Sequence, residues 1–472
     1  MGKHKGLGDS IEVFTRYTGI KWLVKKIIGE DCGCDERQEK LNKLVSYKQN
    51  KKDTIFIQMA AYRDPELVNT LEDLLATAKH PENLRICIAW QHSDDDVWDI
   101  IPEKFWNDKR FNILDIPYEQ AEGVCWARNL IQQYYKGERY TLQLDSHHRF
   151  VQNWDEELIL MYKDLQNKGS KKPLITSYLP SYFPENDPGG RLQEVWKMDF
   201  NRFTPEGYIF TFPSLIEGWQ DKTSPLPARF YSAHFAFTTG KFVEEVPHDP
   251  NMYFHGEEPS IAARAFTWGY DLFHPHKIIG WHEYTREGKK RHWDDSDDWQ
   301  EKDDSSHFRY RLMHGMDGLT CSPCAQRKLK PYYFGEERTL EEYEKYIGVR
   351  FKDRKVQQYT LNLKYPPNPK PYDYENSLLS HFKHCIDIHT THFKELDYDF
   401  WVVSFEKEDG TVISREDADI NEIHSLMSTA ENGDGVIRIW REFFGEYPNK
   451  YIIWPHSKSK GFITEERIEK VL

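Results

Sequence analysis

The sequence predicts an α/β protein whose centre is a Rossmann-like sheet, with a smaller β-rich part at the C-terminal end. From residue 54 onward, short apolar runs alternate with segments of helical periodicity. No hairpin turn separates the first two runs, which is the pattern of a βαβ unit with parallel strands. The length of 472 residues also exceeds what one hydrophobic core usually holds, so more than one domain is expected.

The first four predicted strands form a nucleotide-binding half of the sheet. Leu67, Leu71 and Leu74 recur at helical spacing after the first strand, and Pro65 suits the first turn of that helix. A turn at Gly123 begins a second helix. The four strands are predicted at residues 54–60, 84–90, 111–117 and 140–144.

The rest of the central part continues the alternation of strands and helices. Residues 180–227 are rich in Pro, Gly and aromatic residues and are predicted to be a substrate-binding loop region. Residues 285–330 are polar and rich in Asp, which predicts a mobile surface segment. Further strands are predicted at 174–178, 229–238 and 270–276, and helices at 158–165, 241–246, 260–269 and 339–346.

Three parts are expected along the chain. Residues 1–50 predict short amphipathic helices in an N-terminal adaptor, and residues 53–350 hold the α/β domain. The proline-rich stretch Pro366–Pro371 is a stiff linker and marks the clearest boundary. The strand-like runs after it predict a small β-rich accessory domain at 366–472.

Composition limits the possible functions. With 63 basic and 77 acidic residues the net charge is −14, which disfavours broad nucleic-acid binding and leaves a local basic groove possible. Aromatic residues make up 15% of the chain and suit stacking on sugars or bases as well as core packing.

Targeting signals and cysteines indicate the compartment. No window approaches the about 20 apolar residues of a membrane span, and the N-terminus has no apolar signal core. Seven scattered cysteines are not the pattern of a secreted disulfide scaffold, so we expect a soluble cytoplasmic protein. Cys32, Cys34, Cys321 and Cys324 either form a structural Zn²⁺ site or are unlinked free thiols.

The most informative stretch is the end of the fourth strand, where an apolar run stops at Asp145-Ser146-His147. Ligands of α/β proteins bind at the carboxyl ends of strands. A carboxylate oxygen and an imidazole nitrogen together suit Mn²⁺ or a similar divalent cation, which can neutralise a diphosphate. The alternative interpretation is a strand followed by a polar turn. His148 points to the other side of an extended chain and is expected to be structural.

Five motifs follow one another along the central domain. They are Tyr62-Arg63-Asp64-Pro65-Glu66, Ala127-Arg128-Asn129, Leu144-Asp145-Ser146-His147, His255-Gly256-Glu257-Glu258 and Gly280-Trp281-His282. In this order, residues 53–350 resemble the GT-A glycosyltransferases, specifically the family-60 polypeptide N-acetylglucosaminyltransferases that modify hydroxyproline. The region is more distantly similar to the mucin-type polypeptide N-acetylgalactosaminyltransferases, which share an Asp-x-His motif.

The resemblance implies a GT-A fold with a Rossmann-like mixed sheet. It also implies a metal-dependent, retaining transfer of a sugar from a UDP-sugar, most simply UDP-GlcNAc, to a hydroxyl of a protein or glycan. It implies that Asp145 and His147 bind Mn²⁺ or Mg²⁺, and through it the donor diphosphate, and that His282 completes the metal shell. Two further readings remain open: the acceptor is a hydroxylated base in phage DNA, or the protein is a non-catalytic glycan-binding module. The Gly-Leu-Gly-Asp and Cys-Gly-Cys segments near the N-terminus resemble those of phage-encoded proteins.

The resemblance also implies roles for the other motif residues. Arg63 and Asp64 would hold the nucleoside, although Asp64 could be only a helix cap. Gln91, at the end of the second strand, could meet the base. Arg128 would contact the diphosphate or cap the loop of the Asp-x-His motif.

The paired acids Glu257 and Glu258 are the expected catalytic residues. Glu257 would hold hydroxyls of the donor sugar, with Glu258 nearby. The alternative is that two acids at a helix start only interact favourably with the helix dipole.

Overall fold

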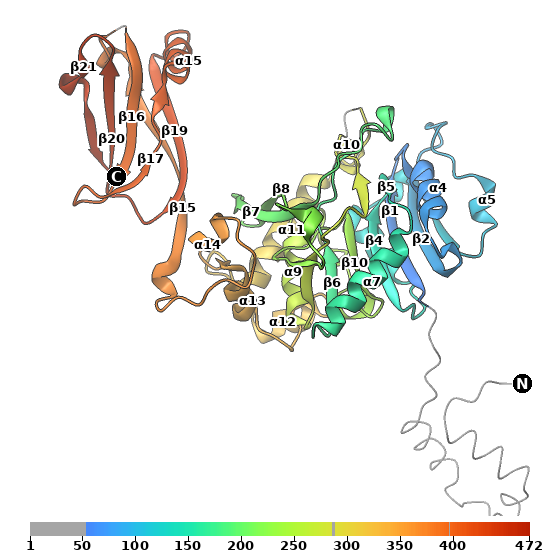
Figure 1. The fold of residues 1–472 in the computed structure, drawn as a ribbon. Coiled ribbons are helices and arrows are strands. Elements are labelled where there is room, and N and C mark those ends of the chain that lie inside the picture. Colours follow the sequence, from blue (N-terminus) through green and yellow to red (C-terminus); the bar gives the residue numbers. More distant parts are fainter. Residues whose placement is uncertain (1–52, 286–287, 396) are drawn as a thin grey trace, which may run out of the picture. The chain divides into compact units, whose positions relative to one another are not determined.

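A computed structural model of the chain describes residues 53–285, 288–395 and 397–472 (Figure 1). The predicted N-terminal adaptor, with Cys32 and Cys34, lies outside the described residues. Residues 55–472 belong to one compact unit.

An eight-stranded sheet forms the centre of the α/β part, in the order β3-β2-β1-β4-β10-β6-β11-β9. The first four of these strands run parallel, and β10 runs antiparallel to both β4 and β6, so the predicted mixed sheet is confirmed. Its strands are β1 (Ile55–Tyr62), β2 (Leu84–His92), β3 (Phe111–Pro117), β4 (Tyr140–Asp145), β6 (Pro173–Thr176), β9 (Leu226–Pro227), β10 (Phe235–Thr239) and β11 (Asp271–His274).

The strand order creates a switch point beside β1. The chain passes from β1 to β2 on one side, and later adds β4 to the other side of β1. Ligands of open α/β sheets bind at the carboxyl edge where the order reverses. Asp64 follows β1 and Asp145 ends β4, so both residues lie at this point.

Helices cover both faces of the sheet because its strands are apolar on both sides (Figure 1). Alternate residues of β1 such as Ile57 pack with Leu71 of α4 (Leu67–Thr77) and Leu158 of α7 (Trp154–Asn167). The intervening Phe56 packs with Ala127 and Ile131 of α6 (Val124–Gln132) on the opposite face. The period of two in the strand therefore fixes which helix lies on which face.

A two-stranded sheet lies beyond β4. Strand β5 (His148–Phe150) pairs antiparallel with β12 (Gly280–His282), and the register places His282 opposite His148. The backbones approach so closely that a Cβ on Gly280 would lie 2.4 Å from the carbonyl oxygen of Arg149. Only glycine fits there, which explains the first residue of the Gly-Trp-His motif.

The prediction of a mobile segment at 285–330 is wrong. The described part of this segment contains α10 (His292–Asp295), α11 (Trp299–His314) and α12 (Pro323–Leu329). The buried stripe of α11 includes Ser306, His307 and His314 beside Tyr310 and Met313. Hydrophobic periodicity missed this helix because polar side chains occupy its buried face.

Two other regions also differ from prediction. The proline- and aromatic-rich stretch contains an antiparallel hairpin of β7 (Trp196–Phe203) and β8 (Ile209–Leu215). Helix α9 (Glu257–Thr267) begins three residues before the predicted start, after Gly256 with a φ of 89°. Both paired acids therefore lie in its first turn. The remaining helices of the α/β part are α5 (Glu103–Trp106), α8 (Phe242–Glu245), α13 (Leu340–Ile347) and α14 (Gln358–Leu361).

The C-terminal part is β-rich, as predicted. Trp401, Val403 and Ile437 belong to a hydrophobic core within it, and β14 pairs with β15. Its elements, with two preceding short strands, are β13 (Val349–Arg350), β14 (Lys355–Gln357), β15 (Leu378–His389), β16 (Tyr398–Glu406), β17 (Val412–Arg415), β18 (Ala418–Asp419), α15 (Ile420–Glu431), β19 (Val436–Gly445), β20 (Lys450–Ser457), β21 (Gly461–Phe462) and β22 (Ile468–Val471).

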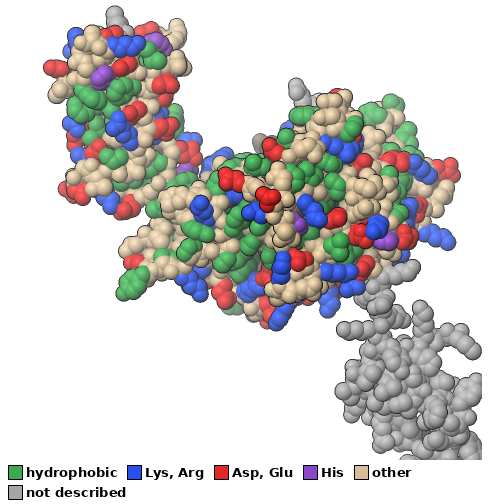
Figure 2. All heavy atoms as spheres, viewed as in Figure 1, with side chains coloured by type: hydrophobic (Ala, Val, Ile, Leu, Met, Phe, Trp, Pro, Cys, Tyr) green, Lys and Arg blue, Asp and Glu red, His purple; other side chains and the backbone are tan. Residues whose placement is uncertain are grey.

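The surface mixes charges of both signs. On the face that Figure 2 shows, Lys and Arg side chains alternate with Asp and Glu side chains over the α/β part. No helix among the described residues combines the length and apolar character required to cross a membrane.

We predict that Gly280→Ala lowers the free energy of unfolding by about 1–3 kcal/mol, because the added methyl group must displace the paired strand β5. Urea denaturation measures the change. Gly218→Ala is the control, because no atom lies within 4 Å of a Cβ at Gly218 and only its left-handed φ of 61° opposes alanine. Equal losses in the two variants would contradict the close approach.

Candidate active site

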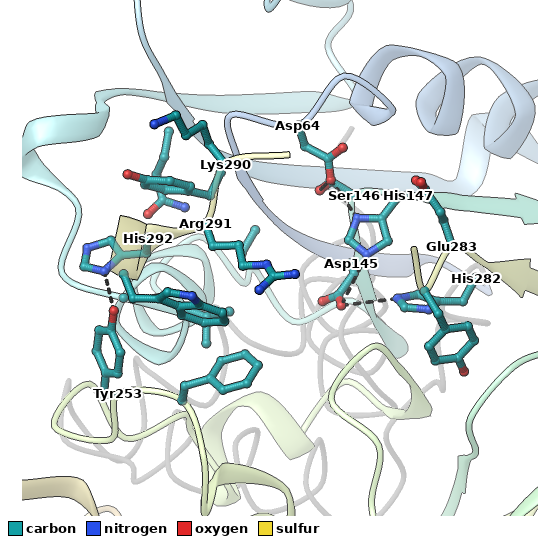
Figure 3. Close-up of a pocket in the computed structure, with 18 residues that line it drawn as sticks. Asp64, Asp145, Ser146, His147, Tyr253, His282, Glu283, Lys290, Arg291 and His292 are labelled. Carbon is teal, nitrogen blue, oxygen red and sulfur yellow. Dashed lines mark hydrogen bonds and ion pairs between the residues drawn. The ribbon is translucent and has the colours of Figure 1, made fainter. Parts of the chain in front are cut away.

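A cavity of about 270 Å³ opens at the carboxyl edge of the sheet, beside the switch point (Figure 3). Its wall combines the ends of β1, β2, β4 and β12 with the start of α6 and the segment that contains α10. The lining residues are Ala60, Tyr62, Asp64, Gln91, Gly123, Val124, Asp145, Ser146, His147, Tyr253, Phe254, His282, Glu283, Tyr284, Lys290, Arg291, His292 and Trp293.

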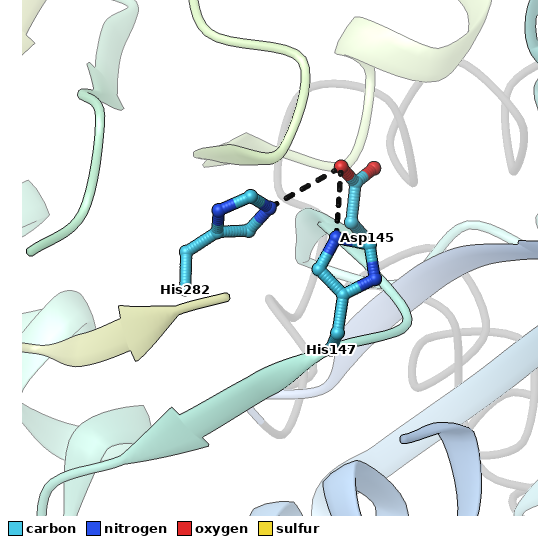
Figure 4. A group of neighbouring side chains, drawn as sticks. All are labelled: Asp145, His147 and His282. Carbon is cyan, nitrogen blue, oxygen red and sulfur yellow. Dashed lines mark ion pairs between the residues drawn. The ribbon is translucent and has the colours of Figure 1, made fainter. Parts of the chain in front are cut away.

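The structure brings together the three residues that were predicted to bind a metal (Figure 4). Ligand atoms of Asp145, His147 and His282 all lie within 4.8 Å of one another. Nε2 of His282 is 3.5 Å and Nε2 of His147 is 3.9 Å from Oδ2 of Asp145. One carboxylate with two imidazoles fits a divalent transition-metal ion, so the donor set suits the expected cation.

Asp64 orients one of these imidazoles. Its Oδ2 lies 2.6 Å from Nδ1 of His147 and accepts a hydrogen bond of 2.6 Å from the hydroxyl of Ser146. Because a carboxylate accepts, Nδ1 of His147 donates to Asp64, and Nε2 of His147 faces Oδ2 of Asp145. Oδ1 of Asp64 accepts a hydrogen bond from the backbone N–H of Glu66, so Asp64 also caps the turn before α4. His148 is fully buried, and its ring packs at 4.9 Å from that of His282.

Arg128 connects the metal-site carboxylate to the paired acids. Its Nη2 donates to Oδ1 of Asp145 at 2.6 Å, and its Nη1 lies 2.8 and 2.7 Å from the two carboxylate oxygens of Glu257. Nδ1 of His248 is 2.7 Å from Oε1 of Glu257. The predicted site residues 128, 145 and 257 therefore form one buried network.

The network sets the protonation of its acids. Burial alone would raise the pKa of Asp145, but the hydrogen bond from His282 and the charge of Arg128 hold it well below its usual range. Burial would also raise the pKa of Glu257, whereas the charge of Arg128 and the hydrogen bond from His248 lower it to about 2. Both acids are therefore ionised at neutral pH.

Glu258 has the opposite protonation behaviour. Burial and the charge of Glu257 raise its pKa to about 7, although the backbone N–H of Ala233 donates to its Oε1 at 2.8 Å. The hydroxyl of Tyr178 donates to its Oε2 at 3.0 Å. Neighbouring acids whose pKa values differ this much are typical of sites that move protons.

A second cavity, of about 280 Å³, adjoins the first. Asp145, Phe254 and Tyr284 line both cavities. Arg128, Glu257 and Glu258 line the second cavity and are absent from the lining of the first. The arrangement provides one space on each side of the Asp145 carboxylate.

Comparison with known protein families identifies the family of the chain. The family described as Glycosyltransferase (GlcNAc) matches residues 54–108 and 99–353, which include every motif residue singled out in the sequence. The chain belongs to this family. The prediction that the protein is a glycosyltransferase is thereby confirmed.

A solved structure resembles this glycosyltransferase at low identity. It is the crystal structure of GalNAc-T7 with UDP, GalNAc and Mn²⁺, at 13% identity and a TM-score of 0.46, and the match covers 90% of this chain and 73% of that chain. A search of curated proteins gave no significant match.

Only one of two further predicted donor-binding residues lines the first cavity. Gln91 lines the cavity and donates to the carbonyl oxygen of Ala61 at 3.0 Å. Arg63 is not among the lining residues. Its guanidinium binds Asp96 at 2.6 Å and Asp295 at 2.9 Å, which ties the loops after β1 and β2 to α10. A role for Arg63 in direct nucleoside contact stays a prediction.

Sequence reasoning missed the residues on the α10 side of the glycosyltransferase site. Lys290 and Arg291 line the first cavity with His292 and Trp293, and Figure 3 shows the Arg291 side chain extending between His292 and Asp145. His292 is held by Tyr253, whose hydroxyl lies 2.7 Å from Nδ1. The run Lys289-Lys290-Arg291 was the available signal, because basic residues inside an Asp-rich segment suit an anionic ligand.

The proposed zinc site of four cysteines is not tested. Cys32 and Cys34 lie outside the described residues. Cys321 and Cys324 carry free thiols.

We predict that Glu258→Gln becomes more stable relative to the wild type as the pH rises from 5 to 8. The folded pKa of about 7 lies above the ordinary value of 4.5, so the folded state binds more protons between these values and wild-type stability falls across this window. Glutamine has no such titration. Denaturation at several pH values measures the difference, with the exposed Glu217→Gln as control. Parallel pH profiles for the wild type and Glu258→Gln would contradict the raised pKa.

Proposed function

We propose that the protein transfers N-acetylglucosamine from UDP-GlcNAc to a hydroxyl of a protein acceptor, with retention of configuration and with the help of Mn²⁺ or Mg²⁺. The observation that supports this most is the cluster of Asp145, His147 and His282 at the junction of two cavities, in a chain of the glycosyltransferase (GlcNAc) family. Donor and acceptor must meet at one point, and this is where the two cavities meet.

The three clustered residues would hold the cation. When bound, the cation would neutralise negative charge on the diphosphate of the departing UDP. Asp64 keeps His147 in the tautomer and orientation that such binding needs.

Lys290 and Arg291 would add positive charge on the other side of the diphosphate. Both are exposed and line the first cavity. Arg128 is less suited to this task, because its outer nitrogens already bind Asp145 and Glu257. Arg128 would instead keep the carboxylates of Asp145 and Glu257 ionised and hold them in position.

Glu258 would take the proton of the acceptor hydroxyl. It lines the second cavity, and a pKa of about 7 lets it accept and release a proton near neutral pH. The ionised Glu257 beside it suits hydrogen bonding to hydroxyls of the transferred sugar.

The decisive test is transfer by the purified protein with UDP-GlcNAc, Mn²⁺ and peptides that carry hydroxyproline, serine or threonine. We expect release of UDP and a mass increase of one N-acetylhexosamine on a peptide. We predict that Asp145→Asn lowers the rate at least about 100-fold, since several kcal/mol of charge stabilisation are lost. The exposed Asp94→Asn is the control. Transfer at an undiminished rate in folded Asp145→Asn would overturn the assignment.

Asp64→Asn should act on metal binding and spare the chemical step. Asparagine accepts a hydrogen bond from His147 less strongly, so the Mn²⁺ concentration for half-maximal activity is expected to rise about 10–100-fold, with the rate restored at saturating Mn²⁺. Ser146→Ala is the matched control, because it removes the other hydrogen bond to Oδ2 of Asp64 and leaves His147 in place. A lower maximal rate with an unchanged Mn²⁺ requirement would show that Asp64 contacts the donor.

A further inference from the structure

A second group of potential metal ligands lies apart from the Asp145 cluster. Ligand atoms of His255, Asp303 and His307 all lie within 4.8 Å of one another. Asp303 and His307 are four residues apart on α11 and share one face of that helix. His255 comes from the turn before α9, so the cluster joins two separate segments of the chain.

Two polar atoms of this cluster, on Asp303 and His307, are buried without a hydrogen-bond partner among the described residues. His307 is 6% exposed, and neither its Nε2 nor Oδ1 of Asp303 has a hydrogen-bond partner among the described residues. The nearest contact between them is 3.5 Å, from Nε2 of His307 to Oδ2 of Asp303. Buried polar atoms are normally paired, so these two atoms need a partner that the described residues do not provide.

The surrounding structure holds the cluster in place. Two contacts tie the segment before α9 to α11: the hydroxyl of Ser306 accepts from the backbone N–H of Tyr253 at 2.6 Å, and Asp249 binds Arg309 at 2.6 Å. The ring of Tyr208 lies 5.2 Å from that of His255 and 5.3 Å from that of His307, nearly parallel to the first. His255 is therefore presented to α11 by a fixed segment.

We propose that His255, Asp303 and His307 form a second divalent-metal site, of the zinc-binding type, that joins α11 to the segment before α9. Two imidazoles and a carboxylate are ligands that Zn²⁺ prefers. Ligand atoms of a tetrahedral Zn²⁺ lie roughly 3.3–3.6 Å apart, which matches the separation of His307 and Asp303. Glu206 lies within electrostatic range of all three residues and adds negative charge beside them.

The location gives this site a structural task. His255 and Tyr208 line the second cavity, and Glu257 and Glu258 begin α9 after the intervening Gly256. A metal between His255 and α11 would hold the wall of the cavity beside the paired acids. The proposal does not depend on the sugar, the acceptor or the activity of the Asp145 cluster.

The test is zinc binding by the metal-free full-length protein, measured by calorimetric titration with ZnCl₂ and by metal analysis after desalting. A variant with Asp145→Ala and His147→Ala removes the first cluster, and we expect it to retain one equivalent of zinc. Adding Asp303→Ala should weaken that binding more than about tenfold, since even loss of a group that only supports a ligand costs about this much. Adding Asp304→Ala instead removes the exposed neighbouring acid on α11, and zinc binding should keep its affinity.

Two results would overturn the site: no zinc bound by the first-cluster variant, or equal affinity with Asp303→Ala and Asp304→Ala. His255→Ala keeps the test decisive if Asp303→Ala fails to fold, because His255 is exposed and outside the helix. It should lower zinc affinity and remove the rise in melting temperature that zinc produces in the parent variant. Unchanged affinity in His255→Ala would likewise reject the proposal. Transfer activity is not a readout, so failure here is distinct from failure of the proposed function.

Discussion

The guanidinium of Arg128 holds the site together. It is 4% exposed and lies between the carboxylates of Asp145 and Glu257. Removing a charge from water costs several kcal/mol unless partners compensate it, so each member of this network depends on the others. Asp145 comes from β4 and Glu257 from α9, and the ion pairs fix the distance between these elements.

The same network has one more negative than positive charge. Arg128 offsets one of its two carboxylates, and burial keeps the pKa of His248 below its ordinary value, so this imidazole adds no charge at neutral pH. A buried excess of negative charge favours a cation. The imidazoles of His147 and His282 face Oδ2 of Asp145, whereas Arg128 binds Oδ1, and the proposed metal would restore the balance on the Oδ2 side.

Sheet topology explains why two cavities meet there. β4 lies between β1, with which it is parallel, and β10, with which it is antiparallel. The parallel side opens the first cavity at the switch point. On the other side, the turn before α9 and the β7–β8 hairpin form the wall of the second cavity. Asp145, at the end of β4, is the residue both spaces share.

The sequence alone determined most of the α/β part and the members of the Asp145 cluster. Apolar strands and leucine spacing located β1 to β4 and the helices between them, and the order of the motifs singled out residues 145, 147 and 282. The helices at 288–330 could not be found in this way, because α11 buries serine and histidine on the face that a hydrophobic pattern would mark.

Only the tertiary structure decided which partners these residues have. Arg128 and Glu257 are 129 positions apart, and their ion pair depends on how α6 and α9 pack against the sheet. The register of β12 on β5 brings His282 to the Asp145 cluster, and the fold of α11 brings His307 to His255. Such contacts arise from long-range packing, which has no local signal, so the sequence indicated the members of the Asp145 cluster, and only the fold revealed the second cluster.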